Sequence, residues 1–133
     1  MKKIMFVPIL LALAACSGPK SAINDDKVFF AFDSAEISSA AKKDLVAQST
    51  YMKKHNDVDV TLEGHCDERG STEYNLALGA LRAGNAAHVM IKDGIEPKRI
   101  KTISYGKEHP QYLGTGEEVW AKNRNVTTKT KKK

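Results

Sequence analysis

The sequence predicts an α/β sandwich in which one sheet carries its helices on a single face. Two apolar segments, at 28–32 and 58–62, are each followed by a pattern with helical spacing. A third apolar segment at 100–105 ends at a glycine, and a last strand begins near residue 123. A chain of 133 residues allows one domain with one modest core.

The first 16 residues predict export. Lys2 and Lys3 precede an apolar run over 4–13, which is too short for a membrane span of about 20 residues. The segment 13–16, Leu-Ala-Ala-Cys, resembles the lipobox of bacterial lipoproteins. The resemblance implies that 1–15 is a signal peptide and that Cys16 carries lipid, followed by a linker to residue 26. The alternative is an ordinary cleaved signal peptide in which Cys16 is incidental.

The net charge of +5 lies mostly at the two ends of the chain. Without the leader and the lysine-rich segment 129–133, the body is nearly neutral. No basic face remains that could follow phosphates, so we expect no nucleic-acid partner. The segment 129–133 is expected to be a frayed, solvated tail. The alternative is that it attracts anionic cell-wall polymer or lipid head groups.

The domain is expected to span 27–128 and to begin with an aromatic-rich strand at 28–32, which leaves through a turn at 33–35. Ser38 or Ser39 then caps a helix that runs to about Lys54. One stripe of this helix is expected to face the core, and it consists of Ala41, Leu45, Gln48 and Met52.

The second helix is expected to begin near Ser71 or Thr72 and to close at Gly94. A turn at 97–99, a strand at 100–105, a loop at 107–116, a short helix at 117–122 and a final strand should follow. One side of the second helix has small residues that allow close packing, and its members are Gly79, Ala83, Ala86 and Met90.

The candidate site lies between the strand at 58–62 and the second helix. Asp67 follows the strand, and Asn75, Leu78 and Arg82 share one strip of the helix at i, i+3 and i+7. A pocket with a carboxylate, a guanidinium, an amide and an apolar wall suits a ligand that carries an ammonium and a carboxylate on one carbon. The alternative is that Asp67 and Arg82 pair with each other or point into water.

The two cysteines do not predict a disulfide, since Cys16 is expected to be acylated and Cys66 then has no partner. Cys66 is expected to be a small, mostly buried filler. Neighbouring strand residues such as His65 and Cys66 point to opposite faces, and no second cluster completes a ligand set. The sequence therefore predicts neither a metal or cofactor site nor a cysteine nucleophile.

A longer motif adds to these inferences. The run 64–70, Gly-His-Cys-Asp-Glu-Arg-Gly, followed by Asn75, Leu78 and Arg82, resembles the signature of the OmpA-like peptidoglycan-binding domain. The segments 67–70 and 73–75 are similar in particular to the peptidoglycan-associated lipoproteins of the Tol-Pal system. The resemblance implies a β/α/β/α/β fold with a mixed four-stranded sheet.

The resemblance also implies a function. The domain would bind the diaminopimelate of a peptidoglycan stem peptide, with Asp67 on the ammonium and Arg82 on the carboxylate. Asn75, Leu78 and the turn at Asp33 would complete the site. The protein would be a non-enzymatic tether, anchored in the outer membrane and facing the periplasm, with TolB and other Tol-Pal components as partners and a role in constriction at division.

Two other function classes stay open. One is a periplasmic cell-wall enzyme that uses Asp67, Glu68 and Glu73, and the other is a structural lipoprotein without a ligand. If the protein is a tether, Asp67→Ala or Arg82→Ala is expected to release it from cell-wall sacculi and to leave the fold intact. The family commonly has a second arginine where this sequence has Asn125, so no site role is expected for Asn125.

Overall fold

A computed structural model of the chain describes residues 22–133. The elements alternate between strands and helices, as the sequence predicts. In chain order they are β1 (Lys27–Phe29), α1 (Ser39–Lys54), β2 (Val58–His65), α2 (Thr72–Lys92), the 3-10 turn η1 (Pro97–Arg99), β3 (Ile100–Gly106), α3 (Glu117–Asn123) and β4 (Asn125–Lys132).

The strands form one mixed four-stranded sheet in the order β1-β4-β2-β3. β4 pairs antiparallel with both β1 and β2, whereas β2 pairs parallel with β3. The last strand of the chain is therefore central, with Leu62 of β2 opposite Thr128. The predicted fold class is confirmed.

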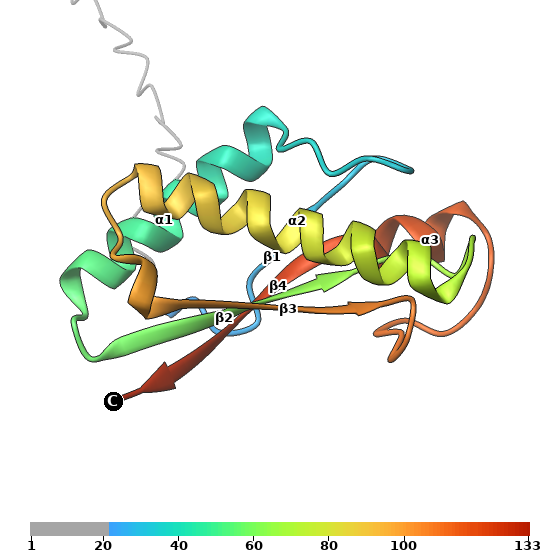
Figure 1. Ribbon diagram of the computed structural model, residues 1–133. Coiled ribbons are helices and arrows are strands. Elements are labelled where there is room, and N and C mark those ends of the chain that lie inside the picture. Colours follow the sequence, from blue (N-terminus) through green and yellow to red (C-terminus); the bar gives the residue numbers. More distant parts are fainter. Residues whose placement is uncertain (1–21) are drawn as a thin grey trace, which may run out of the picture.

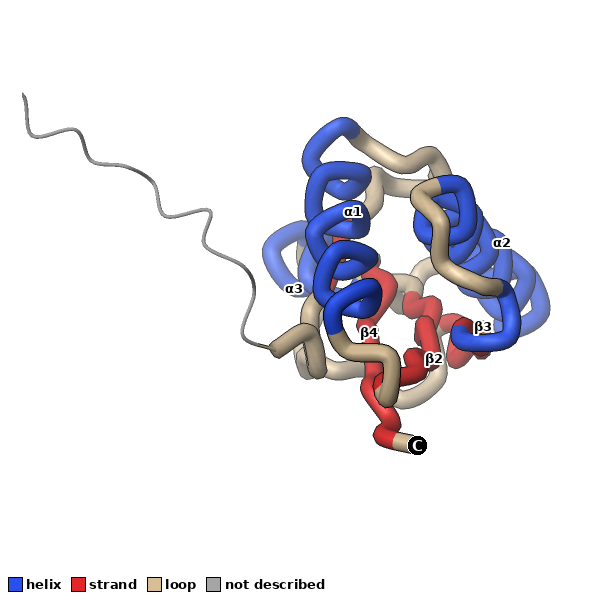
Figure 2. Tube along the Cα trace, turned by 90° about the vertical axis from the view of Figure 1, so that its left-hand side faces the viewer, coloured by secondary structure: helices blue, strands red, loops and turns tan. Residues whose placement is uncertain are grey.

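Helices α1 and α2 cover one face of this sheet, and α3 lies beside the end at which β4 begins (Figure 1; Figure 2). The Ser38 hydroxyl caps α1 by accepting from the amide of Ala41, and the Ser71 hydroxyl caps α2 in the same way. These caps satisfy amides that have no partner within the helix. The four predicted core residues of α1 and those of α2 are all buried.

Two glycines bring α2 close to the sheet. A Cβ added at Gly64 of β2 would lie 1.9 Å from the carbonyl oxygen of Gly79 on α2. A Cβ added at Gly79 would lie 2.3 Å from the Ser104 hydroxyl of β3. Only residues without a side chain permit this approach, and it fixes α2 at Gly79 against the end of β2.

Three expected boundaries were wrong. β1 ends at Phe29, after which Phe30 is buried in the core and Phe32 is exposed. The packed domain begins at Ile23, which is fully buried, rather than at residue 27. The lysines of the expected tail belong to β4 up to Lys132, because their backbone pairs with that of β2 as far as Val58.

The predicted signal peptide and the acylated Cys16 lie outside the described residues. Within residues 22–133, no helix combines the length and apolar character that a membrane crossing requires.

Candidate ligand-binding site

A cavity of about 220 Å³ opens where β2 ends and α2 begins. All five residues predicted to bind a ligand line it, and these are Asp33, Asp67, Asn75, Leu78 and Arg82. Phe32, Cys66, Arg69, Gly70 and Tyr74 complete the wall. The predicted strip of α2 and the loop after β2 therefore do face a common space.

Arg82 is the most constrained member of the site. Its side chain is only 1% exposed, although it borders the cavity. Its Nε donates to the carbonyl of Ser34 at 2.8 Å, Nη1 to that of His65 at 3.0 Å, and Nη2 to that of Ala31 at 3.1 Å. A guanidinium has five N–H donors, so one on each terminal nitrogen remains. Burial lowers the pKa of Arg82.

Asp67 is held by two other arginines, not by Arg82. Its Oδ1 accepts from the Arg69 amide at 3.0 Å and from Arg69 Nε at 3.1 Å, and Oδ2 accepts from Arg69 Nη2 at 2.8 Å. Arg124 Nη1 lies 3.5 Å from the same Oδ2. Burial alone would raise the pKa of the carboxyl, but these hydrogen bonds outweigh it and lower the pKa. Asp67 is therefore an anion at neutral pH.

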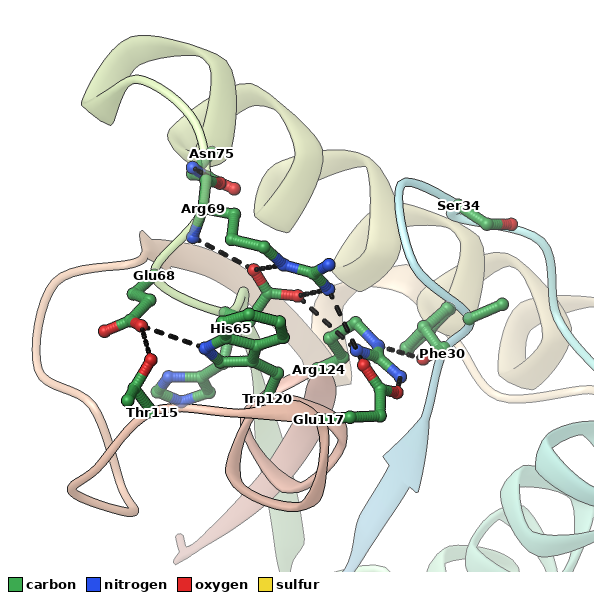
Figure 3. A network of polar contacts seen from close by, with 12 residues as sticks. Phe30, Ser34, His65, Glu68, Arg69, Asn75, Thr115, Glu117, Trp120 and Arg124 are labelled. Atoms are coloured by element: carbon green, nitrogen blue, oxygen red, sulfur yellow. Dashed lines mark hydrogen bonds and ion pairs between the residues drawn. The ribbon is translucent and has the colours of Figure 1, made fainter.

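Arg69 is stacked between two aromatic rings at the mouth of the cavity. Its guanidinium carbon lies 3.9 Å from the ring centre of Phe32 and 4.0 Å from that of Trp120. Such contacts attract the cation to the ring faces. Glu68 holds the Trp120 ring in place. Its Oε1 accepts from Trp120 Nε1 at 3.0 Å and from the hydroxyl of Thr115 (Figure 3).

Arg124 joins the start of β4 to the site. It is 6% exposed, its Nε donates to the carbonyl of Phe30 at 2.9 Å, and its Nη2 donates to Glu117 Oε1 at 2.9 Å. Arg69, Arg124 and Glu117 converge in Figure 3. Neither arginine was predicted to have a role. The available signal for Arg69 was that it belongs to the segment 67–70, which resembles the family.

The other predicted residues shape the cavity. The Asn75 amide nitrogen donates to the carbonyls of Arg69 at 2.8 Å and Ser71 at 2.9 Å, which ties the loop to α2. Asp33 has a positive φ of 51° and accepts a hydrogen bond from the Tyr74 hydroxyl. Leu78 supplies an apolar wall.

Cys66 is a buried free thiol whose pKa is raised by burial, and it donates to the carbonyl of Asn75. This confirms the predicted filler role. Asn125 lies fully buried on the sheet, where it bonds Gln111 and the carbonyl of Lys122, and does not line the cavity. In the described part of the chain, no three acidic, histidine or cysteine side chains are grouped to hold a metal ion.

The sheet order and this cavity define an OmpA-like α/β domain with a polar cavity at one end of the sheet. The sequence profile of the OmpA family matches residues 29–124. The chain therefore belongs to the OmpA family.

Several proteins similar to this chain are peptidoglycan-associated lipoproteins. The chain is 41% identical over 103 residues to the peptidoglycan-associated lipoprotein of Mesorhizobium japonicum and 35% identical over 142 residues to that of Rhizobium meliloti. These matches cover 77% and 89% of the chain, and 61% and 81% of the relatives. The chain thus spans less than two thirds of the Mesorhizobium protein.

A crystal structure of the peptidoglycan-associated lipoprotein from Burkholderia pseudomallei has the same fold. It superposes with a TM-score of 0.76 at 34% sequence identity, covering 79% of this chain and 89% of that one.

Proposed function

We propose that this protein is an outer-membrane lipoprotein that binds the diaminopimelate of peptidoglycan without breaking a bond, and so tethers the membrane to the cell wall. The relatives named as peptidoglycan-associated lipoproteins support this assignment. By the same homology, TolB and the other Tol-Pal components are its proposed partners, and envelope integrity and constriction at division its proposed roles.

The observation that carries the proposal is a buried guanidinium, that of Arg82, which has no carboxylate at ion-pair distance in the described chain. In the described chain no carboxylate pairs with Arg82, whose three hydrogen bonds all go to neutral carbonyls. A buried charge is costly unless it is paired. A carboxylate entering the cavity could accept hydrogen bonds from the N–H groups of Arg82 that no backbone carbonyl accepts, and the side-chain carboxylate of diaminopimelate is such an acceptor.

The ammonium of the same ligand would go to Asp67. Both oxygens of Asp67 already accept from Arg69, so the ligand must share or displace this guanidinium. The 3.5 Å contact between Arg124 and Oδ2 is the longest one that Asp67 makes, so it is the contact that a second cation would displace most readily. The ligand would thus insert between Asp67 and Arg82, which form no ion pair with each other.

The ionisation of the site argues against the enzyme alternative. A glycoside hydrolase needs one carboxyl with a raised pKa as its general acid. Hydrogen bonds from Thr115 and Trp120 lower the pKa of Glu68, and those from Arg69 lower that of Asp67. Two carboxylates held as anions suit binding rather than proton transfer.

Co-sedimentation with purified cell-wall sacculi tests the proposal. Leu78→Glu would place a carboxylate in the cavity one helical turn before Arg82, where it pairs with the guanidinium in place of the ligand. We expect this variant to lose binding by on the order of tenfold or more, the effect of one lost charge-assisted hydrogen bond.

Leu81→Glu is the matched control, because Leu81 is 55% exposed on the same helix and does not line the cavity. It should bind as the unaltered protein does. Equal sedimentation of both variants would favour a structural lipoprotein without a ligand.

Arg82→Ala is a poor test, contrary to the expectation that the fold would stay intact. Removing this buried side chain strips Ser34, His65 and Ala31 of their partner. Of these three residues only His65 is buried, and leaving its carbonyl unsatisfied costs about 1 to 3 kcal/mol. The cavity left by a fully buried side chain adds to this cost. Loss of binding would therefore not be distinguishable from loss of structure.

A further inference from the structure

A basic groove lies at the end of the sheet opposite the ligand cavity. It has a volume of about 260 Å³ and is formed by the beginnings of β2 and β3 and the end of β4. Its basic residues are Lys98, Arg99, Lys101, Lys131, Lys132 and Lys133, and Asp59 is its one carboxylate.

Three of these six basic residues have no ion-pair partner in the described chain, because Lys98 pairs with Glu96, and Arg99 and Lys133 pair with Asp59. In residues 22–133, no carboxylate lies within ion-pair distance of Lys101, Lys131 or Lys132, while Asp59 is shared between Arg99 at 3.7 Å and Lys133 at 3.5 Å. Arg99 is 9% exposed, and its Nε has no hydrogen-bond partner. The groove therefore carries an excess of hydrogen-bond donors and positive charge that suits an anionic surface.

The described chain begins beside this groove. Asn24 Oδ1 accepts from the amide of Thr130 at 3.0 Å, one residue before Lys131. The amide of Asp25 donates to the carbonyl of Thr128 at 2.8 Å. Figure 2 shows the start of the described chain and the C-terminus at the end of the molecule that faces the viewer.

The sequence limits how far this end can lie from a lipid on Cys16. Seven residue steps separate Cys16 from Ile23, which corresponds to at most about 25 Å of extended chain. The ligand cavity lies at the other end of β2, about 20 Å from Asp59 by the rise of a strand from Asp59 to His65. An anchor at Cys16 thus holds the basic end near the membrane and the cavity away from it.

We propose that the basic groove docks on anionic phospholipid head groups of the leaflet that holds the anchor. This inference rests on the lipid anchor of the proposed function. Lysine and arginine donate to phosphate oxygens, and basic residues next to a membrane are attracted to anionic lipid. The short tether keeps the groove at a high effective concentration near the leaflet. Docking directs the open cavity towards the cell wall.

Lysine acylation of the full, lipidated protein tests the docking. The protein is placed in vesicles of phosphatidylcholine alone, or of phosphatidylcholine with phosphatidylglycerol, and modification is followed by mass spectrometry. We expect Lys101 and Lys131 to react about fivefold more slowly when phosphatidylglycerol is present, as one basic residue's attraction implies. Lys107, which donates to the carbonyl of Gly70 at the cavity, and Lys122 on α3 should react equally in both vesicle types, and molar salt should abolish the protection.

A charge-reversal pair adds a second readout. Lys101→Glu with Lys131→Glu changes two exposed residues and should remove the protection of Lys132 and Lys133. Lys42→Glu with Lys43→Glu makes the same change in charge on exposed positions of α1 and should preserve it. Binding to sacculi should be unchanged in both variants.

Vesicle flotation separates the two proposals. Equal acylation in both vesicle types, with the protein floating in both, overturns the groove proposal alone. Failure to float in either composition overturns the anchor, and the groove proposal with it. Protection by soluble polyphosphate but not by vesicles would overturn the assignment to lipid.

Discussion

At the scale of single residues, Arg82 and Asp67 have opposite charges but different partners. Arg82 is turned towards three backbone carbonyls and keeps two donors for the cavity. Asp67 is neutralised by Arg69 and approached by Arg124. In the described chain the two side chains form no ion pair with each other because each is held by other partners, and both line the same cavity.

The lowered pKa of Asp67 makes a testable contribution to stability. Asp67→Asn keeps an oxygen for the Arg69 amide but loses the charge, and we expect it to cost about 1.5 to 3 kcal/mol of unfolding free energy at pH 7. Because the folded pKa is depressed, this contribution is present above the ordinary carboxyl pKa of about 3.9 and declines as pH falls through the folded value.

Urea unfolding of both proteins at pH 7, 4 and 3 measures the effect. The difference in unfolding free energy should shrink towards the lowest pH. A difference that stays constant over this range would contradict an ionised Asp67 held by Arg69.

The spacing of residues along the chain was sufficient to predict the cavity wall but not its ion pairs. Asn75, Leu78 and Arg82 share a face because helical geometry requires it. The contact between Arg124 and Asp67 depends on β4 lying beside β2 in the sheet. No local pattern contains that pairing, so the role of Arg124 could not be derived from periodicity.

At the scale of elements, the closest packing is that of α2 on the sheet through Gly64 and Gly79. Gly64→Ala would force a methyl group against the carbonyl of Gly79, and we expect it to destabilise the fold by about 1 to 3 kcal/mol or more. Gly84 also lies within α2 but has no atom within 4 Å of an added Cβ. Gly84→Ala should therefore stabilise the protein by about 0.5 to 1 kcal/mol.

Thermal unfolding of the two alanine variants compares these effects directly, since each adds the same methyl group. Opposite shifts in the melting temperature are expected. A loss of stability at Gly84 as large as that at Gly64 would mean that helix packing here does not depend on the missing Cβ.

The helices were predictable to within a residue or two because caps and apolar periodicity mark them. The last strand was harder, since its buried positions include Thr127 and Thr128 rather than large apolar residues. Thr128 is satisfied by the side chain of Gln48 on α1, and Thr127 by Gln111 and Asn125. Such polar pairs across the fold have no signature in the strand itself.

At the scale of the whole molecule, the domain has two ends with different chemistry. The cavity with its buried guanidinium lies where β2 ends, and the start of the described chain lies with the basic groove where β2 begins. A protein that joins a membrane to a wall needs its two attachments on opposite sides. The central strands β2 and β4 set the distance between them.

The central claim is that Arg82 binds a carboxylate while Asp67 binds the ammonium of the same amino acid. Calorimetric titration with a stem peptide that contains diaminopimelate, and with the lysine counterpart that lacks the side-chain carboxylate, tests this most directly. We predict that the diaminopimelate peptide binds more tightly by on the order of ten- to a hundredfold, the effect of one charge-assisted contact. Equal affinity for the two peptides would contradict the account.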